Sequence, residues 1–208
     1  MNLFYKSLYD IFDIMSYNHF LYYVNHFKTL FNQDNFYSNF PTQILHEGHP
    51  PLYFILIKFW SYFFGNSELA LRSFSLFCGI LSFFVLFTLF LKKSTKKIAS
   101  WGVLIMLIFN PFLFYFFTEA RMYALAFLLA ALNFKYWLDY QENRKLMSKE
   151  FLYFCISAIA LLYTHYFGLF FLSSLVFIEL LRVGFKRSIL NHILPLLLFL
   201  PWGFAIRK

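Results

Sequence analysis

Residues 46–54, which read HEGHPPLYF, place two imidazoles and a carboxylate beside paired prolines at the start of a long apolar stretch. Proline fixes φ and has no N–H to lose in a first helical turn, so the prolines predict a helix over 51–65. Imidazole and carboxylate groups can bind a divalent cation such as Mg, Mn or Zn. The simpler interpretation of His46, Glu47 and His49 is a polar helix entrance, and both stay open.

Three further positions combine charge or imidazole with apolar surroundings. Glu119 and Arg121 follow an apolar run two residues apart, where they can form an ion pair at a helix end or hold an anion. Arg72 lies inside an apolar run and could pair with Glu68 at i,i+4 or serve a site. His165, between two tyrosines, could carry a proton near neutral pH or belong to an interfacial aromatic belt.

The N-terminal region contributes two carboxylates. Asp10 and Asp13 are three residues apart, so a helix would bring both to one face. A carboxylate can act as a general base if it reaches the proton it must remove. The alternative is that both are solvated side chains on an amphipathic segment.

Composition sets the class of protein. The chain has 208 residues, of which 61% are hydrophobic, 25% aromatic and 13% charged, with a mean hydropathy of +0.60. A soluble domain cannot cover that much apolar side chain, so we expect an all-α, polytopic integral membrane protein. The net charge of +8 is concentrated between apolar runs, where it orients a membrane protein and indicates no nucleic-acid partner.

The apolar runs predict about six transmembrane helices: 69–91, 98–117, 120–139, 151–166, 167–182 and 189–206. Residues 151–182 form either two spans broken near Gly168 or one long kinked region. The 51–65 helix is too short to span, so we expect it to lie along the membrane surface or to re-enter the membrane. We therefore divide the chain into residues 1–67, an outer-face loop with juxtamembrane helices, and residues 68–208, the transmembrane region.

Basic residues predict the orientation. Ten lysines and arginines fall in three alternate loops, whereas the turns between them hold only Arg121. By the positive-inside rule the basic loops are cytoplasmic. The polar positions described above then share the outer face of an inner (cell) membrane protein.

Four short segments in this order resemble the GT-C glycosyltransferases, in particular the bacterial branch similar to protein O-mannosyltransferases and to the lipid A aminoarabinose transferase. They are HPPLYF at 49–54, FGNSELALR at 64–72, EARMYA at 119–124 and YTHYFG at 163–168. The resemblance covers about residues 45–170.

The resemblance implies a reaction in which an outer-face acceptor attacks the anomeric carbon of a sugar carried on a polyprenyl phosphate. An acidic residue in the first outer loop acts as base; Asp10 is the better positional match and Asp13 the second. Basic residues hold the phosphate, here Arg121 and Arg72. The first segment and the segments around Glu119, Tyr123 and His165 would bind the donor, and the acceptor would be a lipid, a glycan or a protein.

The sequence departs from that family in two ways. The family's first span and its adjacent acidic pair are not found as such, and its C-terminal spans and outer domain are missing. A non-catalytic membrane subunit, or a flippase-like carrier of lipid-linked sugars, is therefore the alternative to a transferase.

Overall fold

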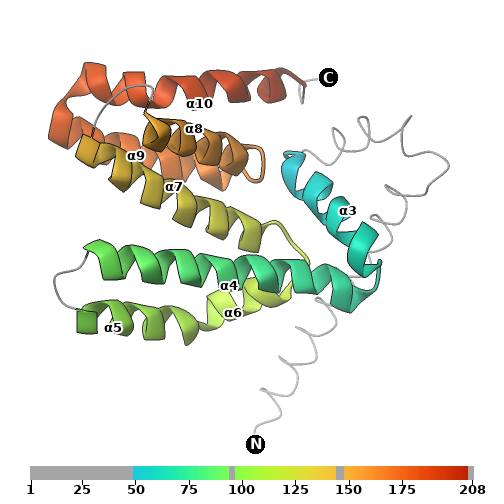
Figure 1. The fold of residues 1–208 in the computed structure, drawn as a ribbon. Helices are drawn as coiled ribbons and strands as arrows, with labels where there is room; N and C mark the ends of the chain where they lie inside the picture. Colours follow the sequence, from blue (N-terminus) through green and yellow to red (C-terminus); the bar gives the residue numbers. More distant parts are fainter. Residues whose placement is uncertain (1–48, 94–96, 144–147, 206–208) are drawn as a thin grey trace, which may run out of the picture. The chain divides into compact units, whose positions relative to one another are not determined.

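The computed structural model describes residues 49–93, 97–143 and 148–205, all within a compact unit formed by Gly48–Lys208. This described part contains eight helices and no strand, which confirms the all-α prediction. The helices are α3 (Leu52–Phe64), α4 (Glu68–Lys93), α5 (Lys97–Ile108), α6 (Pro111–Thr118), α7 (Tyr123–Asn143), α8 (Lys149–Leu162), α9 (Phe167–Val183) and α10 (Phe185–Ala205) (Figure 1).

One predicted run is divided. The sequence suggested a continuous helix over 98–117, but α5 ends at Ile108, and the chain bends by 59° before α6. Pro111 has no N–H to donate and disfavours helical geometry at the residue before it. Asn110 adopts an extended conformation, and its side-chain oxygen accepts from the backbone N–H groups of Phe112 and Leu113. A new helix therefore begins at this point.

Length and hydropathy single out one helix in the described ranges as able to cross a membrane, Glu68–Lys93 with 26 residues. The bent α5–α6 pair qualifies as a second if it forms one span. Leu52–Phe64 and Asn191–Phe204 are apolar but shorter. The six-span topology stays a prediction.

Helix α7 lies between α4 and α8 and has its most extensive contacts with these two (Figure 1). Near the start of α7, Ser75 Oγ of α4 lies 3.4 Å from the backbone oxygen of Arg121. Near its end, Lys92 Nζ lies 3.1 Å from Asp139 Oδ1. Because both contacts join matching ends, α4 and α7 run parallel, as the alternating order of the apolar runs predicts.

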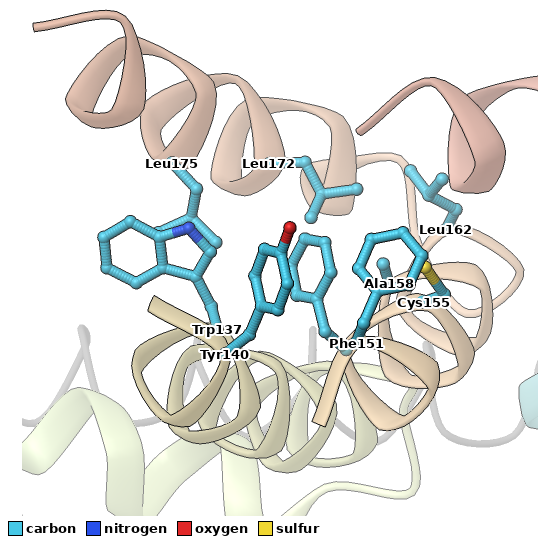
Figure 2. Close-up of a cluster of buried hydrophobic side chains, with 9 residues drawn as sticks. Trp137, Tyr140, Phe151, Cys155, Ala158, Leu162, Leu172 and Leu175 are labelled. Atoms are coloured by element: carbon cyan, nitrogen blue, oxygen red, sulfur yellow. The ribbon is translucent and has the colours of Figure 1, made fainter. Parts of the chain in front are cut away.

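A core of buried side chains joins α7, α8 and α9. Figure 2 shows Trp137 and Tyr140 of α7 pointing toward Leu172 and Leu175 of α9. Phe154 of α8 is fully buried in the same cluster. Nearby, the side-chain nitrogen of Asn133 donates to the Phe154 carbonyl oxygen at 2.9 Å and to Ser157 Oγ at 3.0 Å, which joins α7 to α8. This core fixes the ends of α7, α8 and α9 relative to one another.

Candidate functional site

Three rings from distant parts of the chain meet at one end of the bundle. The ring centroid of His165, in the turn between α8 and α9, lies 6.0 Å from that of His49 and 5.4 Å from that of Tyr123. His49 precedes α3, and Tyr123 is the first residue of α7. The structure therefore brings together one residue from each of three segments that the sequence analysis selected.

Backbone contacts hold this arrangement in place. The N–H of Leu52 donates to the carbonyl oxygen of Tyr163 at 2.9 Å, which joins the start of α3 to the α8–α9 turn. His165 Nδ1 accepts from the N–H of Phe167 at 3.0 Å, so the other ring nitrogen carries any proton of the neutral imidazole. A Cβ at Gly168 would lie 2.9 Å from Leu161 Cγ and 3.3 Å from the Leu161 carbonyl carbon, so the turn needs a glycine here.

Glu119 and Arg121 stand between α6 and α7. Arg121 Nε lies 3.1 Å from Glu119 Oε2, and the Tyr115 hydroxyl hydrogen-bonds the same carboxylate. Glu119 is 8% exposed. The pair forms the ion-paired helix end that the sequence allowed, and Arg121 precedes Tyr123 by two residues in the sequence.

Arg72 also has a carboxylate partner. Its guanidinium lies 2.6 Å from Glu68 Oε1, one turn earlier on α4, and both side chains are partly exposed. The i,i+4 pairing considered from the sequence is therefore present. Arg72 lies about one turn before Ser75, the α4 residue that approaches Arg121, so both arginines belong to the same end of α4.

The remaining predicted site residues, Asp10, Asp13, His46 and Glu47, lie outside the described residues. Within the described ranges, no three side chains of the histidine, cysteine, aspartate or glutamate types gather as a metal site would require. Two imidazoles of the described part, those of His49 and His165, have ring centroids 6.0 Å apart. Metal binding by His46, Glu47 and His49 stays a prediction.

An apolar cavity lies between α3 and α8. It has a volume of about 490 Å³, is widely open to the surface, and is lined by Pro51, Leu52, Ile55, Ile156, Ile159, Ala160 and Tyr163. Pro51 and Tyr163 each lie two residues from an imidazole of the site, His49 and His165. A ligand with a polar head and an apolar chain could therefore contact both regions at once.

The sequence analysis missed a second polar cluster. Glu179 of α9 is 0% exposed, and its carboxylate accepts from Trp137 Nε1 at 3.0 Å and from Asn191 Nδ2 at 3.1 Å. Gln141 also donates to it, and His192 Nδ1 lies 3.6 Å away. The available signal was a lone glutamate in the apolar run 167–182, since an ionisable residue in such a run needs partners.

Acidification is expected to destabilise the fold through His165. Burial, and then the nearby His49, lower the pKa of His165 below its ordinary value of 6.5. Below pH 6.5 the unfolded chain therefore binds a proton that the folded chain resists, so the free energy of unfolding falls as pH decreases. Denaturant unfolding between pH 7.5 and pH 5 should show a smaller loss for His165→Gln than for the parent chain. Equal pH dependence in both would contradict this assignment.

Comparison of the chain with family models, with curated proteins and with solved structures finds no match in any of the three.

Proposed function

We propose that this chain is a multi-pass inner-membrane glycosyltransferase of the GT-C type that takes its sugar from a polyprenyl-phosphate donor at the outer face. The observation that carries the proposal is the apolar cavity of about 490 Å³, whose lining residues Pro51 and Tyr163 lie two residues from His49 and His165. These two imidazoles are close to one another, and His165 is also close to Tyr123. An isoprenoid chain suits the cavity, and a sugar phosphate suits the polar groups beside it.

Exposed apolar side chains support the membrane location. Phe59 on α3 is 65% exposed, Met106 on α5 is 75% exposed, and Phe109 is 79% exposed. Soluble proteins rarely leave such side chains in large contiguous patches, whereas lipid would cover them. In the proposed topology the paired end of α4 and α7, at Lys92 and Asp139, is cytoplasmic, and the three rings lie outside.

The proposed reaction is an inverting displacement. The acceptor hydroxyl oxygen bonds to the anomeric carbon while the bond from that carbon to the phosphate oxygen breaks, and Asp10 takes the hydroxyl proton, with Asp13 as the second candidate base. Arg121 and Arg72 stabilise the polyprenyl phosphate that leaves, since guanidinium groups match phosphate oxygens. His49, Tyr123 and His165 position the sugar, and Glu119 orients Arg121. The resemblance also implies a sugar-phosphate contact for His46 and Glu47.

Filling the cavity should weaken donor binding. Ala160→Trp places an indole among the lining residues, so we expect the Kd for a polyprenyl-phosphate sugar to rise at least about 10-fold, equivalent to ~1.4 kcal/mol. The measurement is donor binding to the protein in lipid nanodiscs, with a water-soluble sugar phosphate as a second ligand. Leu152→Trp, at an exposed α8 position outside the lining, is the matched control. Unchanged donor affinity in Ala160→Trp would overturn the proposal that the cavity binds the isoprenoid chain of the donor.

A carrier or non-catalytic subunit is the second candidate. Both carboxylates described at this end of the bundle, Glu68 and Glu119, are already paired with arginines. This end of the described part thus provides candidate donor-binding groups, while its two carboxylates are held in ion pairs. A carrier would bind the lipid-linked sugar with the same cavity and rings and transfer nothing.

A further inference from the structure

The buried Glu179 cluster lies at the opposite end of the bundle from the three rings. Each contact described for its carboxylate comes from a donor or an imidazole: Trp137 and Gln141 on α7, and Asn191 and His192 on α10. Tyr140 adds a link by donating to Asn191 Oδ1 at 2.8 Å. The cluster therefore attaches one end of α10 to both α7 and α9 through directional bonds.

The other end of α10 contacts the turn that carries His165. The Tyr163 hydroxyl donates to the carbonyl oxygen of Leu198 at 3.0 Å, and Trp202 Nε1 donates to the Tyr166 hydroxyl at 3.2 Å. Tyr163 and Tyr166 flank His165 in the sequence. Leu198 lies about 10 Å along the helix from Asn191. One helix thus joins the buried carboxylate to the candidate site.

Two prolines weaken the backbone of α10 between and beside these contacts. Pro195 cannot donate to the carbonyl oxygen of Asn191, and Pro201 cannot donate to that of Leu197. A helix that lacks these bonds bends more easily, so its path depends more on side-chain contacts at its two ends. The Glu179 cluster supplies the contacts at one end.

We infer that Glu179 is a positioning residue for the donor site, acting through Asn191 and α10 on the Tyr163–Tyr166 turn. The inference deepens the proposed function, because that turn carries His165 and its Tyr163 lines the apolar cavity. Loss of the Glu179 contacts lets α10 shift, and the turn shifts with it. Glu179 touches no part of the donor in this arrangement.

Tryptophan fluorine NMR can test this on the full chain without donor. The four tryptophans report on separate regions: Trp137 on the cluster, Trp202 on the turn, and Trp60 and Trp101 on α3 and α5. In 5-fluorotryptophan-labelled protein in nanodiscs, Glu179→Gln should shift the resonances of both Trp137 and Trp202 and leave the other two unchanged. A shift of Trp137 alone would overturn the inference.

Two further variants separate positioning from general loss of stability. Leu175→Ala removes a buried side chain one turn from Glu179 and no polar contact, so it should leave the Trp202 resonance in place. Tyr140→Phe removes only the hydroxyl bonded to Asn191 and should shift Trp202 in the same direction as Glu179→Gln, by less. If Glu179→Gln does not fold, Tyr140→Phe decides, and an unmoved Trp202 resonance overturns the inference.

Donor binding then separates this inference from the proposed function. If the proposed function and the positioning role are both correct, Glu179→Gln weakens binding of the polyprenyl-phosphate sugar several-fold, and Leu175→Ala does not. If the parent chain binds no such donor while Trp202 still responds to Glu179→Gln, the proposed function fails and the positioning role stands. If the parent chain and Glu179→Gln bind the donor with equal affinity and the Trp202 resonance does not shift, the positioning role fails and the proposed function stands.

Discussion

Asp10→Asn is expected to lower the rate of sugar transfer by about 100- to 10,000-fold, the range that general-base catalysis commonly contributes. The amide keeps the size of the side chain but cannot take the acceptor proton as the bond to the anomeric carbon forms. Donor affinity should stay unchanged, because the proposed donor contacts are the cavity, the three rings and the arginines. The measurement is single-turnover transfer from a polyprenyl-phosphate sugar in nanodiscs, beside equilibrium donor binding.

Asp13→Asn is the matched comparison, since it removes a carboxylate three residues away in the sequence, a spacing that a helix would place on the same face. A large loss for Asp10→Asn and a small one for Asp13→Asn assigns the base to Asp10, and the reverse assigns it to Asp13. If the parent chain binds donor and both variants leave every activity unchanged, the enzyme proposal fails and the carrier takes its place.

Arg121→Ala is expected to weaken donor binding by about 10- to 150-fold, which corresponds to the ~1.5–3 kcal/mol of a hydrogen bond to a charged group. Arginine matches two phosphate oxygens at once, so Arg121→Lys should restore only part of the affinity. Arg72→Ala should have the smaller effect, because Arg72 is more exposed and separately paired with Glu68. Donor titration in nanodiscs measures all three variants.

Removing Arg121 also leaves Glu119 buried without its guanidinium partner, which by itself could distort the site. Glu119→Gln controls for this effect, since it breaks the ion pair but keeps the arginine. Donor affinity in Glu119→Gln should stay within a few-fold of the parent value. An equal loss in Glu119→Gln and Arg121→Ala would show that the ion pair matters for structure and that Arg121 holds no phosphate.

Much of the helical order could be predicted because its causes are local. The prolines at 50 and 51 start α3, and the apolar runs after 68, 120, 151, 167 and 189 each correspond to a helix. The break before Pro111 was missed, although its cause is local too: a capping asparagine followed by proline ends one helix and begins the next. The residues on both sides of Asn110 and Pro111 are apolar, so hydropathy alone predicts one run where the structure has two helices.

The candidate site, in contrast, depends on contacts between distant parts of the chain. The sequence selected His49, Tyr123 and His165 separately, by polarity next to apolar runs, but gave no measure of their separation. The ring of His165 lies 6.0 Å from that of His49 and 5.4 Å from that of Tyr123, which depends on α7 packing between α4 and α8 and on the bond from Leu52 to Tyr163. These contacts join residues far apart in the sequence, and no local pattern encodes them.

By itself, then, the sequence determined that the described residues are helical, where most of their helices begin and end, and that basic loops alternate with less charged turns. These follow from side-chain hydropathy and backbone restrictions, which act over a few residues. Only the tertiary structure decided which polar groups share a site and which are buried as partners. Glu179 is the clearest case: a lone glutamate in an apolar run becomes a satisfied carboxylate because α7 and α10 bring donors to it, and only packing creates that environment.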